Sequence, residues 1–207
     1  MAIRNFVFDV GNVLVPWDPA GIERRAFGEE RVAAADYVAP LRGHDTWIAV
    51  NRGELTLEEA AQRYIAEDGF ARGDIDRLYA ELFASFPLIA DSAQLLRECR
   101  AAGYRTFAIT DNVHEIVAHL KGVHDFWPLF EVAAVSAELG VLKPDPAIYR
   151  WLLDTAELTA RECVFLDDVA RNVEGARAVG MEAFLFTNAA QARRDLAAIG
   201  VDLTPAS

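Results

Sequence analysis

Short apolar segments recur along the chain and predict buried β-strands, because they are rich in β-branched and aromatic residues and are bounded by turn-forming residues. Amphipathic stretches, which predict helices, alternate with the later segments. Strands alternating with helices favour a parallel sheet covered on both faces, an α/β fold. The predicted strands are residues 3–9, 104–110, 131–136, 163–167 and 182–186, and the predicted helices are residues 92–102, 113–121, 146–157 and 172–179. Gly103, Gly122 and Gly180 are the predicted stops of three of these helices.

Residues 16–90 interrupt the alternation, because they show helical patterns and no convincing strand. Thr56 and Glu59 form a capping box at the start of one of these helices. We therefore predict two domains, an α/β core of residues 1–15 and 91–207 and an inserted all-helical cap of residues 16–90. An insertion after the first strand lies above the carboxyl ends of the strands, where open α/β sheets bind ligands. The cap is expected to act as a lid.

The composition of the chain excludes some classes of binding partner. The chain of 207 residues has a net charge of −12, which argues against nucleic acid or an anionic membrane as a partner. A site for an anionic substrate would need its own positive charge. Two cysteines are too few for a disulfide framework and predict buried free thiols. Because we see neither a signal peptide nor an apolar run of membrane-spanning length, we expect a cytoplasmic protein.

Candidate chemistry gathers where the predicted strands end. Asp9 ends the first strand, the pair Thr110 and Asp111 ends the second, Lys143 follows the third, and the pair Asp167 and Asp168 ends the fourth. The carboxyl ends of parallel strands share one edge of a sheet, so these side chains are expected to converge.

Clustered carboxylates repel one another unless a cation neutralises them, and Mg²⁺ is the usual partner of a few carboxylates and a phosphate. Asp9 could bind the metal and attack phosphorus, forming an aspartyl-phosphate that water hydrolyses. The carbonyl of Gly11 could face the metal, and Lys143 could neutralise a phosphoryl oxygen. The Thr110 hydroxyl and nearby amides at a helix start suit the other phosphate oxygens.

These motifs together resemble the haloacid dehalogenase-like (HAD) hydrolase superfamily, in order and in spacing. The matching segments are Phe8-Asp9-Val10-Gly11-Asn12-Val13-Leu14, Ile109-Thr110-Asp111-Asn112, Lys143-Pro144-Asp145-Pro146 and the run from Phe165 to Ala176. The resemblance implies a Rossmann-like core and the helical cap of the first subclass. The opening motif and the cap segment Asn51-Arg52-Gly53-Glu54-Leu55-Thr56 resemble the branch that includes phosphatases of sugar phosphates such as glucose 1-phosphate.

The resemblance also implies residue roles. It makes Asp9 the nucleophile and a metal ligand, with the Gly11 carbonyl and Asp168 completing the metal shell and Asp167 bound directly or through water. Thr110 and Lys143 would hold the phosphate, Asn12 and Asp111 would line the substrate site, and Asn172 would orient the last loop. The implied function is Mg²⁺-dependent hydrolysis of a small phosphorylated metabolite, by a monomer or a homodimer.

The chain departs from the family at Gly11, where most phosphatases of the family have an aspartate that acts as general acid and base. The leaving group would then take its proton from water or from a cap residue such as His44 or Asp45, or would need none. Asp111 stands where many relatives have asparagine, and Trp47 is a candidate for lining the pocket. The alternatives are a 2-haloacid dehalogenase, which the adjacent acids Asp167 and Asp168 disfavour, and a non-catalytic protein that binds phosphate or a partner.

Overall fold

The computed structural model describes residues 2–205 and contains one five-stranded parallel sheet in the order β3-β2-β1-β4-β5. The strands are β1 (Asn5–Phe8), β2 (Arg105–Thr110), β3 (Ala133–Val135), β4 (Cys163–Asp167) and β5 (Glu182–Leu185). The core helices are α6 (Ala90–Ala101), α7 (His114–Val123), α8 (Ser136–Leu139), α9 (Pro146–Thr155), α10 (Ala170–Ala178) and α11 (Ala189–Ala198). Two short 3₁₀ turns, Trp127–Leu129 and Ala160–Glu162, complete the core.

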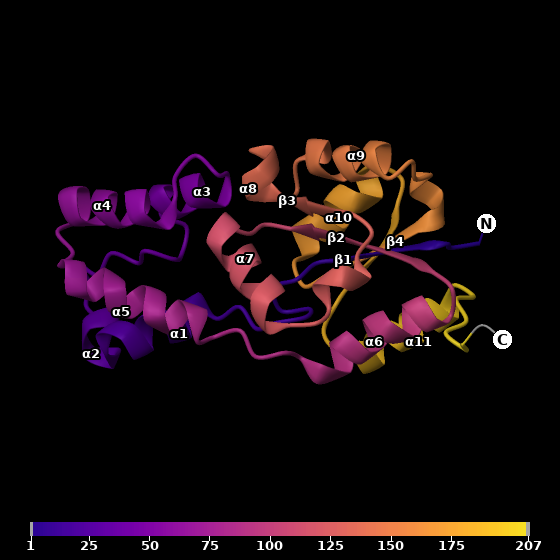
Figure 1. The fold of residues 1–207 in the computed structure, drawn as a ribbon, viewed down its shortest axis with the longest axis horizontal. Coiled ribbons are helices and arrows are strands. Elements are labelled where there is room, and N and C mark those ends of the chain that lie inside the picture. The colour runs from indigo at the N-terminus through magenta and orange to yellow at the C-terminus, as the bar shows by residue number, and fades with distance from the viewer. Residues whose placement is uncertain (1, 206–207) are drawn as a thin grey trace.

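Both faces of the sheet are covered, as Figure 1 shows, with α9 and α10 on one face and α6 and α11 on the other. Strand β1 lies in the centre, and its alternating side chains enter two separate apolar clusters. Phe6 and Phe8 pack in the cluster that includes α6 and α11, whereas Val7 packs in the cluster that includes α9 and α10. All three side chains are fully buried, so the end of β1 is held firmly.

The insertion forms a helical unit at the end of the molecule where β1, β2 and β4 end (Figure 1). Its helices are α1 (Pro19–Phe27), α2 (Glu29–Val32), α3 (Asp45–Asn51), α4 (Leu57–Asp68) and α5 (Arg72–Phe83). The chain returns to the core beside the point where it left, because the amide of Ile89 donates a 2.8 Å hydrogen bond to the carbonyl of Leu14. The inserted all-helical cap is therefore confirmed, while its boundaries at residues 16 and 90 stay a prediction.

Polar contacts join the cap to the core. The Ser136 hydroxyl at the start of α8 donates a 2.7 Å hydrogen bond to the carbonyl of Asn51 at the end of α3. The carboxylate of Glu115 on α7 accepts a 2.9 Å hydrogen bond from the amide of Leu57, the first residue of α4. Since helix-start amides lack partners within their own helix, Glu115 supplies a cap from another domain. The structure therefore holds the cap over the ends of the strands.

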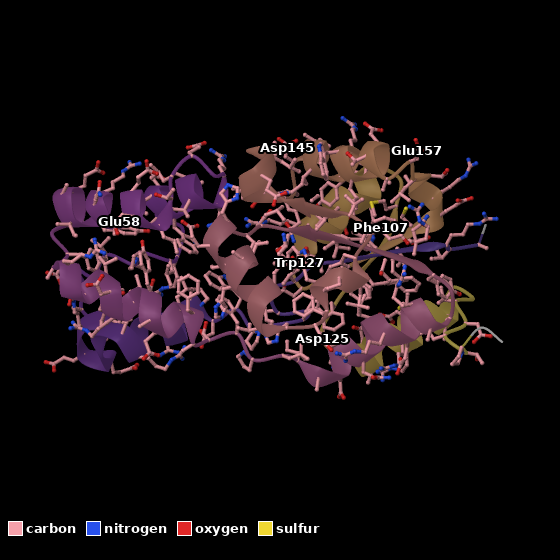
Figure 2. All side chains as sticks on the ribbon, viewed as in Figure 1. Glu58, Phe107, Asp125, Trp127, Asp145 and Glu157 are labelled. Carbon is pink, nitrogen blue, oxygen red and sulfur yellow. The ribbon has the colours of Figure 1, made fainter. Side chains whose placement is uncertain are left out.

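The predicted strands are all confirmed to within two residues at each end, and the capping box of Thr56 and Glu59 is confirmed as well. The predicted stop at Gly122 is wrong, because α7 continues through it to Val123. Gly103 and Gly180 do follow helices, and both adopt positive φ, +86° and +92°. Helix α11 was not among the predicted elements. Figure 2 shows the outcome in side chains, with Phe107 of β2 inside the molecule and Glu157 at its surface.

Two smaller expectations concern the cysteines and the membrane. Cys99 and Cys163 are buried free thiols, as predicted. No helix within residues 2–205 is both long enough and apolar enough to cross a membrane.

Candidate active site

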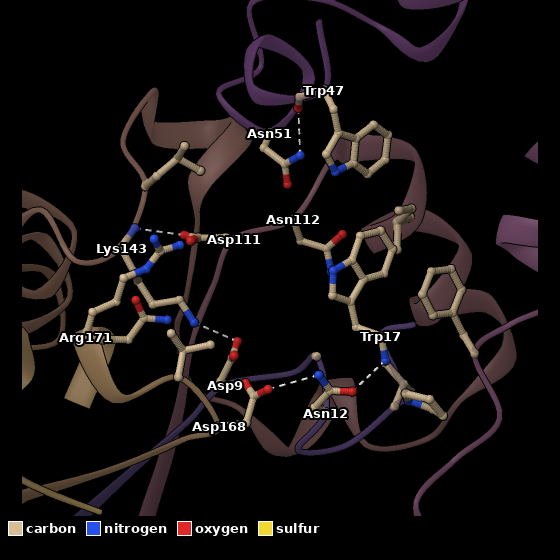
Figure 3. Close-up of a pocket in the computed structure, with 18 of the residues that line it drawn as sticks. Asp9, Asn12, Trp17, Trp47, Asn51, Asp111, Asn112, Lys143, Asp168 and Arg171 are labelled. Carbon is tan, nitrogen blue, oxygen red and sulfur yellow. Dashed lines mark hydrogen bonds and ion pairs between the residues drawn. The ribbon is translucent and has the colours of Figure 1, made fainter. Parts of the chain in front are cut away.

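The predicted site residues meet at one edge of the sheet, around a cavity of about 250 Å³ between core and cap (Figure 3). Asp9 directly follows β1, Asp111 follows β2, and Asp168 follows β4, while Lys143 comes from the loop before α9. The cavity is lined by Asp9, Gly11, Asn12, Val15, Pro16, Trp17, Trp47, Ile48, Asn51, Phe86, Asp111, Asn112, Ile116, Leu142, Lys143, Asp168, Val169, Arg171 and Asn172. Trp47, which was a candidate for lining the pocket, is among these lining residues.

Lys143 is the positive centre of the site. Its Nζ lies 2.8 Å from Asp9 Oδ1 and 2.7 Å from Asp167 Oδ2, and it also donates to the carbonyl of Ile109 at 3.3 Å. The lysine is only 5% exposed. Burial alone would lower the pKa of Lys143, but the neighbouring carboxylates, led by that of Asp9, raise it instead. The ammonium therefore stays charged and is held beside the proposed nucleophile.

Asp9 carries an unfavourable charge in the absence of a further cation. Burial raises its pKa from 3.8 to about 7, and Asp167 adds to this effect, although Lys143 opposes it. Oδ1 accepts the amide of Val10 at 2.7 Å as well as the Lys143 contact. Oδ2 has no hydrogen-bond donor among residues 2–205. One oxygen is thus fixed by the protein, and the other is left for a ligand.

The two adjacent acids after β4 have different surroundings. Asp167 is fully buried and accepts from the Val169 amide at 2.8 Å and from Asn172 Nδ2 at 3.1 Å on each oxygen, besides pairing with Lys143. It does not line the cavity. Asp168 does line it, and burial raises the pKa of Asp168. Asp168 is therefore the better placed of the two to meet a ligand, while Asp167 and Asn172 hold Lys143 in place.

Asn12 connects Asp168 of the core to the backbone of Trp17, near the start of the cap segment. Its Nδ2 donates to Asp168 Oδ2 at 2.9 Å, and its Oδ1 accepts from the amide of Trp17 at 2.8 Å. The residue adopts a positive φ of 53°, a conformation that asparagine tolerates better than most residues. Both ends of the side chain are engaged with protein, and its amide group holds Asp168, while its expected contact with substrate stays a prediction.

The donor set fits a divalent cation. Asp9, Asp167 and Asp168 each offer a carboxylate oxygen, and these atoms lie within 4.8 Å of one another. Burial raises the pKa values of Asp9 and Asp168, and the nearby charge of Asp167 raises them further, while Lys143 opposes both effects. A hard cation with oxygen ligands would offset the repulsion between these carboxylates, and the carbonyl of Gly11, a lining residue, could add a fourth oxygen.

Several groups that were expected to bind the phosphate are buried or already hydrogen-bonded to the protein. Thr110 ends β2 and is 1% exposed, and it is not among the residues that line the cavity. At the start of α7, the Asn112 amide already donates to the Ser136 hydroxyl, and the Val113 amide donates to Asn112 Oδ1. Asp111 lines the cavity, and its Oδ1 accepts the Lys143 amide at 2.9 Å. Its pKa is raised by burial.

The cap acids suggested in place of Gly11 lie elsewhere. His44 starts α3, where its Nδ1 accepts from the Thr46 amide at 3.2 Å and its Nε2 lies 3.3 Å from Asp68. Neither His44 nor Asp45 lines the cavity. The suggestion that one of them protonates the leaving group therefore stays a prediction without support from the cavity lining.

Sequence reasoning missed two lining residues with clear physical properties. Arg171 brings a second positive charge to the cavity. Burial raises the pKa of Asp111, and Lys143 and, to a smaller extent, Arg171 oppose this rise. Trp17 stacks on Trp47 with ring centroids 5.9 Å apart and planes 10° apart. Arg171 lies inside the motif after β4, so its place there was a usable signal, whereas nothing in the chain order pairs Trp17 with Trp47.

The position of Lys143 depends on a close approach by α10. A Cβ added at Gly175 would lie 2.9 Å from Pro144 Cβ and 3.0 Å from the Pro144 carbonyl oxygen and the Tyr149 hydroxyl. We expect Gly175→Ala to displace Pro144 and Lys143, to lower the free energy of unfolding by about 1–3 kcal/mol and to slow turnover roughly tenfold or more. Urea denaturation and kcat measure the two effects.

The matched control is Gly73→Ala in α5, where an added Cβ would meet nothing within 4 Å. This variant should instead gain about 0.5–1 kcal/mol and leave turnover unchanged. If the two variants had the same free energy of unfolding and the same kcat, the close packing at Gly175 would not be what positions Lys143.

Comparisons with known proteins agree with this geometry. The family model of haloacid dehalogenase-like hydrolases matches residues 3–180. A sesquiterpene phosphatase of Aspergillus oryzae is 27% identical over 84% of this chain and 85% of its own length. Two further curated relatives are longer proteins, and the chain spans only 19% and 36% of their lengths.

Solved structures share the fold. A predicted HAD-like hydrolase from Porphyromonas gingivalis superposes with a TM-score of 0.75 at 19% identity, over 96% of this chain and 98% of that one. A HAD family enzyme from Bacteroides thetaiotaomicron, crystallised with magnesium and inorganic phosphate, superposes with a TM-score of 0.72 at 18% identity, over 90% and 96% of the two chains. The family match over most of the chain, with the fold and the converging acids, shows that this protein belongs to the haloacid dehalogenase-like hydrolases.

Proposed function

We propose that this hydrolase cleaves phosphate monoesters of small metabolites in a Mg²⁺-dependent reaction, with Asp9 as the nucleophile. The observation that carries the proposal is the joint position of Asp9, Asp168 and Lys143 at the carboxyl edge of the sheet, beside a cavity. The phosphatase relative and the magnesium-phosphate complex of a structural neighbour support it. The cytoplasmic location and the choice between monomer and homodimer stay predictions.

The geometry supports a two-step displacement. The Asp9 carboxylate attacks phosphorus, the bond between phosphorus and the ester oxygen breaks, and the alcohol leaves after taking up a proton. Water then attacks the phosphorus of the aspartyl-phosphate, which releases inorganic phosphate and restores the carboxylate. Lys143, 2.8 Å from Asp9, neutralises charge on the phosphoryl oxygens in both steps. A bound Mg²⁺, held by Asp9, Asp168 and the Gly11 carbonyl, would supply further charge neutralisation.

Metal removal tests this proposal. Protein treated with EDTA should lose hydrolysis of 4-nitrophenyl phosphate, and added Mg²⁺ should restore it while circular dichroism stays unchanged. Asp168→Asn should raise the Mg²⁺ concentration for half-maximal activity by about tenfold or more, because it removes a proposed ligand oxygen. Asp36→Asn, at an exposed position of the cap, is the control. Turnover that survives full chelation would refute the metal dependence.

Because position 11 has no acidic side chain, we make a separate prediction for the variant Gly11→Asp. A Cβ at Gly11 would meet only the Cβ of Trp17, at 3.6 Å, so the backbone leaves room for a Cβ atom there. Gly11→Asp should speed hydrolysis of alkyl phosphates, whose leaving groups need a proton, by at least about tenfold. The effect on 4-nitrophenyl phosphate, which has a good leaving group, should be smaller.

Gly11→Asn is the matched control, because it has the same shape and no ionisable carboxyl group. Gly11→Asp should hydrolyse alkyl phosphates faster than Gly11→Asn does. If aspartate and asparagine at position 11 behave alike, protonation of the leaving group does not limit the reaction.

Gly11 also keeps the non-catalytic alternative in consideration, since most phosphatases of the family would have a proton donor there. A protein that only binds phosphate should still bind inorganic phosphate but show no turnover of any phosphate ester. Dehalogenase chemistry needs no metal, and the clustered carboxylates of Asp9, Asp167 and Asp168 would then have no metal ion to offset their mutual repulsion.

A further inference from the structure

The cavity beside Asp9 has two chemically different ends. Its charged lining residues all come from the core, whereas the lining residues of the cap segment, residues 16–90, carry no charge. The charged set is Asp9, Asp111, Lys143, Asp168 and Arg171, and the cap set is Pro16, Trp17, Trp47, Ile48, Asn51 and Phe86. A phosphate ester bound with its phosphorus at Asp9 therefore has its organic group among the cap residues.

Two indole rings dominate the cap end of the cavity, as Figure 3 shows. Trp17 and Trp47 stack nearly parallel, with ring centroids 5.9 Å apart and an angle of 10° between the planes. Trp47 is 6% exposed, and Trp17 is half-buried. Ile116 and Leu142 of the core add apolar side chains to the lining of the same cavity. Large aromatic faces and aliphatic side chains favour an apolar group and offer little to a hydroxyl group.

Some of the polar groups at this end are engaged with the protein. Asn51 Nδ2 donates to the Trp47 carbonyl at 2.7 Å, and the Asn51 carbonyl accepts from the Ser136 hydroxyl. Asn112 Oδ1 accepts from the Val113 amide at 2.9 Å. Within residues 2–205 the indole N–H groups of Trp17 and Trp47, Asn51 Oδ1 and Asn112 Nδ2 have no hydrogen-bond partner in the protein. These four atoms are too few for the several hydroxyl groups of a sugar, and buried hydroxyl groups without partners cost binding free energy.

Resting on the proposed function, we infer that the substrate is a phosphate monoester whose organic group is apolar, an aromatic or hydrocarbon group rather than a sugar. Trp17 and Trp47 form the surface that selects it. This inference replaces the sugar-phosphate expectation, because that expectation rests on sequence motifs, whereas the residues that line the cap end of the cavity are mostly apolar.

The decisive experiment compares benzyl phosphate with glucose 6-phosphate in the presence of Mg²⁺. Both are esters of primary alcohols, so their leaving groups are similar and the ratio of kcat/KM reports the organic group. We expect benzyl phosphate to be preferred by roughly 100-fold. Equal or faster turnover of glucose 6-phosphate would overturn the inference.

A third substrate separates this inference from the proposed function. Hydrolysis of 4-nitrophenyl phosphate with no preference for benzyl phosphate would overturn the inference alone. Failure to hydrolyse any of the three esters would overturn the proposed function, and the inference with it.

A variant pair tests the indole surface itself. Trp17→Ala should lower kcat/KM for benzyl phosphate by roughly tenfold or more and change that for glucose 6-phosphate less than about threefold. Trp17 is chosen because it is less buried than Trp47, and urea denaturation checks its fold. The control is Trp151→Ala, a partly buried tryptophan of α9 that does not line the cavity. An equal loss on both substrates in Trp17→Ala would overturn the inference.

Discussion

Replacing Asp9 with asparagine is expected to reduce hydrolysis of every phosphate ester by roughly 10⁴-fold or more, because the variant lacks the nucleophile. The amide has nearly the same shape and can still accept from the Val10 amide and from Lys143. The fold should therefore remain. Initial rates with 4-nitrophenyl phosphate measure the loss, and Asp125→Asn, at an exposed position, is the control.

The same variant is expected to lose activity but to be more stable than the metal-free wild type at neutral pH. The pKa of Asp9 is raised by burial to about 7, so the folded protein binds the Asp9 proton more tightly than the unfolded chain does. Between pH 4 and 7 the metal-free wild type should then lose stability as pH rises, relative to Asp9→Asn. Above about pH 7 the difference should stay constant. A variant that is both inactive and less stable at pH 8 would contradict this account of Asp9.

Lys143→Met is expected to lower kcat/KM by about 10²–10³-fold, since it removes the positive charge that faces the phosphoryl oxygens. It also leaves the buried carboxylate of Asp167, which lies 2.7 Å from the lysine, without its cation. Breaking a buried ion pair on one side typically costs about 3–5 kcal/mol. Urea denaturation of the metal-free protein should show a loss of that order.

The double variant Lys143→Met with Asp167→Asn separates the two roles of the lysine. Neutralising Asp167 should recover part of the lost stability, because one of the two buried carboxylates that Lys143 contacts then carries no charge. It should not recover activity, because the charge beside Asp9 is still missing. Recovery of activity together with stability would mean that Lys143 acts only as a structural ion-pair partner.

The core was predictable because its strands are continuous apolar runs that end at polar residues. Phe6, Val7 and Phe8 are buried on both faces of the sheet, and such strands carry a strong sequence signal. Helix ends were less predictable, since Gly122 sits inside α7 rather than after it. Glycine in a helix costs only about 1 kcal/mol, which tertiary packing easily overrides.

The candidate site was predictable in its membership more than in its division of labour. Chain order placed Asp9, Lys143 and Asp168 at one edge, but it did not show that Asp167 faces the interior and holds Lys143. Adjacent residues at a strand end point in different directions, and only the packed structure shows which one meets the cavity. Trp17 likewise meets Trp47 only because the cap folds back over the core.

The most direct test of the central claim is to trap the covalent intermediate. Borohydride added during turnover reduces an acyl phosphate to an alcohol, so a phosphorylated Asp9 would become homoserine. Mass spectrometry of the tryptic peptide of residues 5–24, with fragmentation to distinguish Asp9 from Asp18, locates the change. We predict reduction at Asp9 that requires substrate and is absent from Asp9→Asn. Steady hydrolysis with no substrate-dependent reduction at Asp9 would contradict the account.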